Sequence, residues 1–300
     1  MIVRVWGARG SLSAPGPATV GYGGNTSCVE VELADGTTLI LDAGSGIREL
    51  GQRLVERDPG VLHVCLTHLH LDHVEGLGFF APLWTSGWKL RFWGAPSATT
   101  ALRDRVAHYL SPPLFPMGLA EAPAESVFED VPREPWRVGT ALVEAETVEH
   151  RGPTVGFRIE EEGRVFVYLP DHEPYLTAAL DDQPEWISGW ALAAGADLLF
   201  HDSQYTEDEY AQRLGWGHSS VSQSATFARA AGVRRLGMFH HDPMRSDREL
   251  EELYDQVAEL LRDDQEPPLI ARDGLELDLG ASRQSAHNPG DDDDRQRFVR

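Results

Sequence analysis

Short apolar segments with a strand-like pattern fill the first half of the chain, and helical patterns enter mainly in the second half. Alternating apolar and polar residues predict half-buried strands, whereas apolar residues three and four apart predict helices. We expect strands at residues 3–6, 28–33, 38–41, 61–66, 89–93, 141–148, 155–160, 165–169, 198–200, 235–239 and 269–271. We expect helices at about 44–55, 97–109, 220–231 and 248–262, with a loop rich in proline and aromatic residues at 111–129. This order predicts an α/β protein with two sheets and helices packed outside them.

The composition predicts one folded unit and a polar tail. The length of 300 residues permits one large domain or two small ones. Residues 281–300 are polar and contain an aspartate run at 291–294, so we expect a folded domain at 1–280 and a disordered acidic tail at 281–300. No apolar run is long enough to span a membrane, and the start of the chain lacks a signal-peptide pattern. Cys28 and Cys65 lie in apolar, strand-like segments and are expected to be buried thiols, which fits a reducing cytoplasm.

The negative charge of the chain argues against some classes of binding partner. Its formal net charge is -22, from 48 acidic and 26 basic residues. A field of this sign repels polyanions and provides no basic surface for duplex nucleic acid or long RNA. A small anionic substrate could still be held by a local positive patch or by metal ions. Solubility alone explains the acidity equally well.

The strongest chemical signal is Thr-His-Leu-His-Leu-Asp-His at residues 67–73. Extended chains alternate their side chains, so His68 and His70 can point the same way. Asp72 and His73 follow where a strand turns into a helix, and they can face a second point nearby. Imidazole and carboxylate groups are typical ligands of catalytic zinc, whereas structural zinc prefers thiolates and a closed shell. The spacing therefore favours two adjacent cations over a structural metal or a chance cluster of surface histidines.

The pattern resembles the metallo-β-lactamase superfamily, in which this motif is followed by a histidine, an aspartate and a last histidine at later strand ends. His150, Asp171 and His240 occupy those places here, and His241 is the alternative for the last one. The resemblance extends from residue 3 to about residue 279. It implies an αββα four-layer sandwich, in which two mixed sheets are flanked by helices.

The resemblance also implies a ligand set for two divalent metal ions. One ion would be held by His68, His70 and His150. The other would be held by Asp72, His73 and His240, and Asp171 would bridge the two. Histidine and aspartate sites accept zinc, manganese or iron, and zinc is the expected metal.

Two further motifs resemble the phosphodiesterase branch of the superfamily, which includes ribonuclease Z. Residues 198–202, Leu-Leu-Phe-His-Asp, look like a strand that ends in an acidic residue, and residues 217–220, Gly-His-Ser-Ser, look like the start of a helix. The resemblance implies that His218 acts as general acid or phosphate stabiliser, with Asp202 as its partner and Asp72 as a third catalytic residue. Serines at a helix start suit a phosphate, and a histidine can protonate a leaving oxygen near neutral pH. The alternative is that His218 only begins the helix.

Three glycine-rich motifs, at residues 6–11, 22–28 and 42–46, resemble a bacterial and phage subgroup that includes cyclic mononucleotide phosphodiesterases. Ribonuclease Z grips tRNA with a long basic arm, which this acidic chain lacks. We therefore expect hydrolysis of small cyclic nucleotides or cyclic phosphates by a hydroxide that bridges the two metals. The alternatives are a ribonuclease Z-like RNA endonuclease, a lactone, thioester or β-lactam hydrolase on the same metals, and a non-catalytic metal-binding module. The family resemblance also implies a homodimer.

Overall fold

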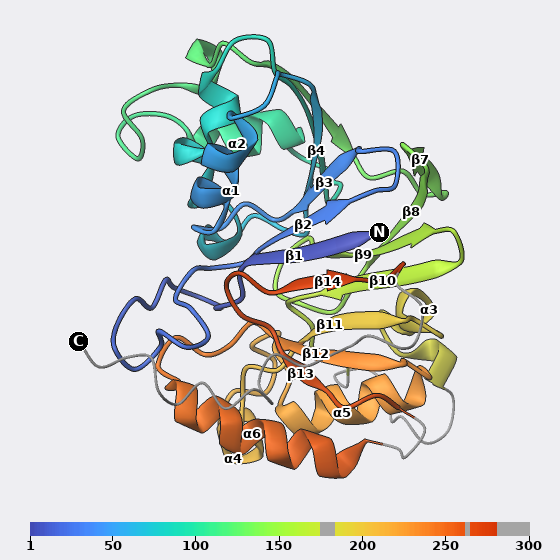
Figure 1. Cartoon of the computed structure of the whole chain (residues 1–300). Coiled ribbons are helices and arrows are strands. Elements are labelled where there is room, and N and C mark those ends of the chain that lie inside the picture. The colour runs from blue at the N-terminus through green and yellow to red at the C-terminus, as the bar shows by residue number, and fades with distance from the viewer. Residues whose placement is uncertain (175–183, 262–264, 281–300) are drawn as a thin grey trace, which may run out of the picture.

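The computed structural model describes residues 1–174, 184–261 and 265–280, and its strands form two sheets (Figure 1). The first sheet has the order β14 (Glu276–Asp278), β1 (Ile2–Gly7), β2 (Cys28–Glu32), β3 (Thr38–Leu41), β4 (Val61–Leu66), β5 (Lys89–Gly94) and β6 (Glu125–Asp130). The second has the order β13 (Leu269–Ile270), β12 (Arg235–Phe239), β11 (Leu198–Asp202), β10 (Arg164–Leu169), β9 (Val155–Glu161), β8 (Ala141–Thr147) and β7 (Trp136–Val138). Both sheets mix parallel and antiparallel pairs.

Helices cover the outer face of each sheet. The α-helices are α1 (Ile47–Leu54), α2 (Leu102–Tyr109), α3 (Trp190–Ala193), α4 (Glu207–Gln212), α5 (Val221–Ala230) and α6 (Asp247–Leu260). The 3-10 helices are η1 (Leu71–His73), η2 (Leu77–Phe79), η3 (Ala81–Trp84), η4 (Leu119–Glu121) and η5 (Pro184–Trp186). Helices α1 and α2 lie beside the first sheet, and α5 and α6 lie beside the second (Figure 1). The result is the predicted four-layer sandwich of two mixed sheets flanked by helices.

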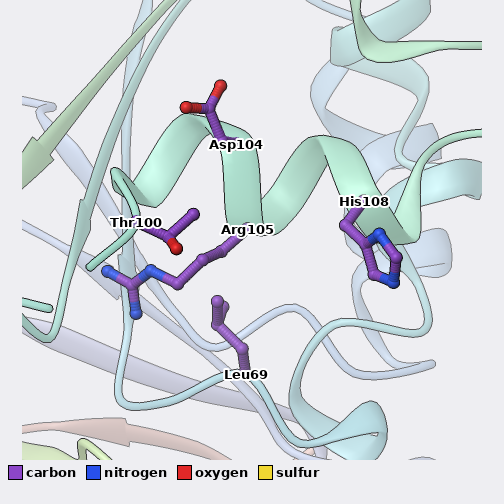
Figure 2. A pocket seen from close by; sticks show the side chains of 5 residues that line it. All are labelled: Leu69, Thr100, Asp104, Arg105 and His108. Atoms are coloured by element: carbon purple, nitrogen blue, oxygen red, sulfur yellow. The ribbon is translucent and has the colours of Figure 1, made fainter.

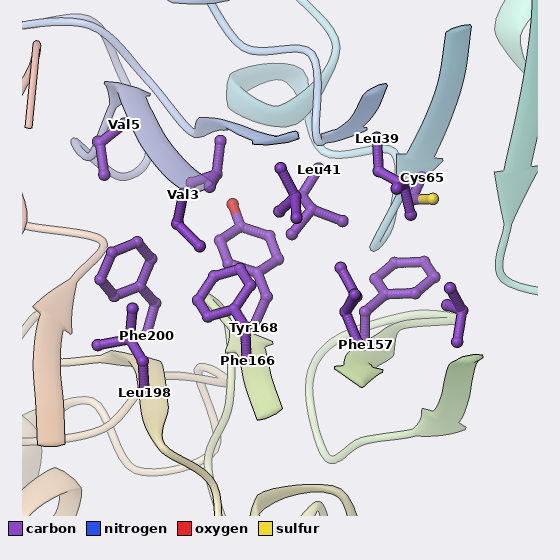
Figure 3. Packing of buried hydrophobic residues seen from close by; sticks show 14 of the residues in the cluster. Val3, Val5, Leu39, Leu41, Cys65, Phe157, Phe166, Tyr168, Leu198 and Phe200 are labelled. Carbon is purple, nitrogen blue, oxygen red and sulfur yellow. The ribbon is translucent and has the colours of Figure 1, made fainter. Parts of the chain in front are cut away.

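Strand alternation divides the core into layers. In β4, Leu62 and Val64 pack under the helices, whereas Cys65 points into the space between the sheets. In β10, Val167 faces the outer helices and Phe166 faces inward. Inward-facing side chains of the two sheets meet in one cluster (Figure 3). Because successive residues of a strand point to opposite faces, each sheet is apolar on both sides, and this rigid sandwich supports the loops at its edge.

Strand direction places several loops at the same edge. Strands β10, β11 and β12 are parallel, so their carboxyl ends lie together. Strand β8 runs in the same direction as β10, because both are antiparallel to β9. In open α/β sheets the carboxyl ends of parallel strands are the usual place for binding residues. The segments after β8, β10, β11 and β12 therefore meet at one edge of the second sheet.

The predicted strands of the core are all present, and the differences lie at the periphery. Helix α2 begins at Leu102, five residues later than predicted. The predicted loop at 111–129 is wrong at its end, because β6 begins at Glu125. Strands β6, β7 and β14 and the short helices α3 and α4 were not predicted. Both edge strands β6 and β14 are largely exposed, which hides the apolar alternation that marks a strand.

Three other predictions concern the whole chain. Cys28 and Cys65 are buried and form no disulfide, as predicted. Every helix of the described residues is too short or too polar to cross a bilayer. The tail predicted at residues 281–300 lies outside the described residues.

Candidate metal centre

The structure brings the seven predicted ligands together at the edge where the strand ends meet. They come from both sheets: His68 and His70 follow β4, Asp72 and His73 lie in η1, and His150, Asp171 and His240 follow β8, β10 and β12. Within the described residues, the potential ligand atoms form three groups, each with its atoms within 4.8 Å of one another. The first contains His68, His70, His150 and Asp171, the second contains Asp72, His73 and His240, and the third contains Asp171, His218 and His240. The first two groups divide the residues as the family resemblance implied, and the third adds His218 to two of them.

Asp171 lies between the first two groups. Its Oδ1 atom is 3.8 Å from Nε2 of His68 and 3.6 Å from Nε2 of His150. On the other side, its Oδ2 atom is 3.0 Å from Nε2 of His73, and Oδ1 is 3.3 Å from Nε2 of His240. A single carboxylate thus faces both groups, as a bridging ligand must.

Hydrogen bonds at the far side of each ring fix which nitrogen faces the centre. His68 Nδ1 is 3.0 Å from the Thr67 hydroxyl, and His73 Nδ1 is 2.8 Å from an oxygen of Asp42. Nε2 of His68 is buried and has no hydrogen-bond partner, and the buried Nε2 of His73 and Oδ2 of Asp171 face each other at 3.0 Å. Buried polar atoms are rarely left unpaired, and metal-binding histidines usually hold their second nitrogen in this way. The donor set therefore fits two divalent cations.

The electrostatics of the cluster also favour cations. Burial alone would raise the pKa of Asp171, but His240, His73 and His68 hold it well below its usual value of 3.8. Burial opposes a charge on His240 as well, yet Asp171 and Asp72 raise its pKa to about 9. Carboxylates that stabilise a buried proton on His240 would equally stabilise a metal ion, so metal binding there would release a proton.

Of the two candidates for the last ligand position, the structure brings His240 into the cluster and leaves its neighbour outside. His240 adopts φ +58, a left-handed conformation that is uncommon for a residue with a side chain, and its Nε2 atom is 3.2 Å from Asp72 Oδ2. His241 turns away, because its Nε2 atom donates to the carbonyl of Ala271 at 2.8 Å. Non-glycine residues in this conformation persist where the surrounding structure enforces them, often at functional sites.

His218 and Asp202 form a pair beside the cluster. Asp202 ends β11, and its buried Oδ2 atom is 2.7 Å from Nδ1 of His218. The His218 ring stacks on the His240 ring at a centroid distance of 4.9 Å, and its Nδ1 atom is 3.8 Å from Asp171. Ser220, two residues after this histidine, caps α5, in agreement with the predicted helix start. The fold thus holds the His218 ring against the metal ligands through its Nδ1 atom, and its Nε2 atom lies on the other side of the ring.

Sequence reasoning missed several residues that support the ligands. Asp42, at φ +60, accepts from the Thr67 backbone at 2.7 Å as well as facing His73. The Ser11 backbone N–H donates to Asp72 at 2.6 Å, and the Gln204 side chain lies between Ser11 and His240. The motifs at 6–11 and 42–46 were noted from the sequence, but only as marks of a subgroup. Nothing local marks Gln204, because its partners lie far away in the chain.

A separate pocket of about 440 Å³ lies beside helix α2 (Figure 2). It is lined by Leu69, Thr100, Asp104, Arg105 and His108. Leu69 lies between two ligands in sequence, but none of the predicted ligands lines this pocket. Phe115, in the predicted loop, contacts the rings of Phe79 and Trp84 and packs on the core cluster under the helices of the first sheet.

Comparisons with known proteins agree with this geometry. Residues 37–241 match the model of the beta-lactamase superfamily domain. Ribonuclease Z of Gemmatimonas aurantiaca is 28% identical over 301 residues, which cover 85% of this chain and 91% of that protein. The metallo-beta-lactamase fold protein YhfI from Bacillus subtilis has a TM-score of 0.67 at 19% identity, covering 92% of this chain and 98% of that chain. Human tRNase Z, short form, has a TM-score of 0.63 at 20% identity, covering 94% and 100%. The chain belongs to the beta-lactamase superfamily and is a metal-dependent hydrolase.

Proposed function

We propose that this hydrolase cleaves phosphodiesters, and that its substrates are small cyclic nucleotides or cyclic phosphates. The observation that carries the proposal is the His218–Asp202 pair, held at 2.7 Å beside a carboxylate that faces two groups of ligands. Phosphodiester hydrolysis needs charge stabilisation at the phosphate and a proton for the leaving oxygen. Hydrolysis of a lactone or β-lactam on two metals has no evident need for this additional pair. The similarity to ribonuclease Z also supports a phosphodiester as the bond that is cleaved.

The proposed metal ligands are the seven residues whose side chains meet at the edge of the sheets. Among them, His68, His70 and His150 hold one cation, Asp72, His73 and His240 hold the other, and Asp171 faces both. Zinc, or else manganese or iron, would when bound polarise the phosphoryl oxygens and lower the pKa of coordinated water. The chain itself contributes a rigid arrangement: Asp42 orients His73, and the Ser11 backbone orients Asp72.

His218 is the residue we assign to proton transfer. Asp202 is fully buried and accepts from the backbone of His172 and from the backbone of Gln204, at 3.2 and 3.1 Å. These bonds hold the carboxylate in place, and its hydrogen bond to Nδ1 then holds the His218 ring. Nε2 of His218 is left to donate a proton to the departing oxygen. Donation from Nε2 requires the imidazolium form, in which both ring nitrogens carry a proton. Asp202 accepts from Nδ1, so it orients the ring, and the Nδ1 proton stays on the ring after Nε2 has given its proton to the leaving oxygen.

Charge favours a small substrate over RNA. Affinity for a nucleic-acid backbone depends mainly on lysine and arginine side chains that neutralise phosphates, and the chain carries a net charge of -22. A cyclic phosphodiester needs only the metal centre and a few neighbouring side chains. The RNA endonuclease alternative rests on the ribonuclease Z relatives, which cover most of the chain at 28% identity.

A substrate panel tests the proposal. Purified protein with quantified metal would be assayed with 3′,5′-cyclic AMP, 3′,5′-cyclic CMP, a 2′,3′-cyclic phosphate, a tRNA precursor and a lactone. The proposal predicts turnover of a cyclic phosphodiester at a kcat/KM well above that for the lactone and without cleavage of the tRNA precursor. Cleavage of the tRNA precursor alone would favour the endonuclease, and turnover of the lactone alone would refute a phosphodiesterase.

A further inference from the structure

Glu173, a buried residue that is not one of the proposed metal ligands, lies between the ligand His150 and the proposed acid His218. Glu173 lies two residues after Asp171 and is fully buried. Its two oxygens accept from the backbone N–H groups of Gly215 and Gly217, at 2.8 and 2.6 Å. Within the described part of the chain, no basic side chain forms an ion pair with it. Burial of a carboxylate is costly unless its charge is compensated, so these two N–H groups make an important contribution to holding Glu173 in place.

The loop that Glu173 holds is also bound from its other side. The carbonyl of Gly217 accepts from Nδ1 of His150 at 2.6 Å, and the carbonyl of Gly215 accepts from Nε of Arg151 at 2.7 Å. Gly217 has φ +95, and a Cβ atom there would be 2.4 Å from Nδ1 of His150. Only glycine allows the backbone to come this close to the ring. The position of the loop therefore determines the direction of Nε2 of His150.

The proposed acid, His218, follows directly after this loop in the chain. His218 follows Gly217, and Ser219, the next residue, donates from its hydroxyl to the carbonyl of His172 at 2.6 Å. The backbone N–H of His172 donates to Asp202, and that of Glu173 donates to the carbonyl of Glu149 at 2.9 Å. Three consecutive residues, 171–173, thus contact the metal ligands, the loop and the partner of the acid.

We propose that Glu173 is a positioning residue that fixes the metal ligand His150 and the acid His218 together, through the backbone of the 215–217 loop. Its carboxylate restrains the N–H side of the loop, so that the Gly217 carbonyl stays in place for His150. Replacing a residue that holds a metal ligand in place typically changes metal affinity or activity by about 10–100-fold. The part of this inference that concerns turnover rests on the proposed function, whereas the part that concerns metal affinity does not.

The test compares two buried glutamates, Glu173 in the loop after β10 and Glu161 at the end of β9. Glu173→Gln keeps the size of the side chain but turns an NH₂ group towards one backbone N–H, so one hydrogen bond is lost. The control is Glu161→Gln, because Glu161 is 2% exposed, accepts from the Ala34 backbone at 3.0 Å and lies at the opposite end of the strands. Metal affinity would be measured by zinc competition with a chromophoric chelator, and kcat and KM with a cyclic nucleotide. Circular dichroism would check the fold.

We expect Glu173→Gln to weaken one of the two zinc sites by about 10–100-fold and to lower kcat more than it changes KM. Glu161→Gln should keep both zinc affinities and kcat. Glu173→Asp, which keeps the charge and reaches one N–H group, should fold and show the same defects to a smaller extent. Wild-type zinc affinity in both folded Glu173 variants, or equal losses in the Glu161 control, would overturn the inference. A wild-type chain without phosphodiesterase activity would refute the proposed function instead, while the zinc measurement would still decide the role of Glu173.

Discussion

Replacing His218 by asparagine separates its proton-transfer role from its structural role. The asparagine amide can donate to Asp202 near the place of Nδ1, so the buried carboxylate keeps its partner and avoids a desolvation cost. The substitution removes Nε2, the nitrogen that we assign to the leaving oxygen. Asp202, whose side chain is fully buried, and the ring stacking on His240 hold the histidine rigidly beside Asp171. We therefore expect the effect of a well-positioned general acid, a loss of about 10²–10⁴ in kcat. This corresponds to about 3–5 kcal/mol of transition-state stabilisation.

The assay uses two substrates whose leaving groups differ. Departure of a ribose alkoxide from a cyclic nucleotide needs a proton, whereas departure of p-nitrophenolate from bis-(p-nitrophenyl) phosphate needs much less help. The variant should lose most of its turnover of the cyclic nucleotide and little of its turnover of the activated ester, with zinc content unchanged. An equal loss on both substrates, or no loss on the cyclic nucleotide, would refute the acid role. Loss of zinc in the variant would assign His218 to metal binding, since its Nδ1 atom is only 3.8 Å from Asp171.

Substitutions at Gly10 and His201 test the surroundings of the site, and Gly16→Ala is the control for the first. Gly10→Ala would place a Cβ atom 2.2 Å from Nδ1 of His240, so we expect zinc affinity of that site to fall by about 10–100-fold in a chelator competition. Gly16→Ala, with no atom within 4 Å of its Cβ, should leave zinc affinity unchanged, and an unchanged Gly10→Ala protein would contradict this packing. Burial lowers the pKa of His201 from 6.5 to about 4, so the folded chain binds fewer protons than the unfolded chain in this range. Stability should fall by up to about 3 kcal/mol as pH drops from 6.5 to 4. In urea unfolding, His201→Gln should show a smaller loss, and an equal loss would be evidence against a neutral buried His201.

The sequence predicted which side chains would converge, because the candidate ligands follow apolar strands in a fixed order. The motif at residues 67–73 is local, and His150, Asp171 and His240 each follow a strand with a clear pattern of apolar residues. The choice between His240 and His241 was open, because it depends on a left-handed backbone at His240 that no residue type signals. Sequence reasoning favoured His240, and the structure places it in the cluster.

Supporting residues were harder to predict because their contacts join distant parts of the chain. Gln204 lies between Ser11 and His240, and Glu173 binds a loop some 42 residues away. A glutamine after a strand or a buried glutamate has no pattern of its own in one sequence. Edge strands such as β6 were missed for a related reason, since an exposed edge needs no apolar alternation.

Metal stoichiometry tests the central claim of a two-cation site most directly. Chelator-treated protein would be titrated with zinc, while bound metal and hydrolysis of a phosphodiester are measured together. We expect two equivalents of zinc per chain, full activity only when both are bound, and loss of at least one equivalent in Asp171→Ala, because that carboxylate faces both groups of ligands. Full activity at one equivalent or less, or two tightly bound ions and normal turnover in Asp171→Ala, would contradict that claim.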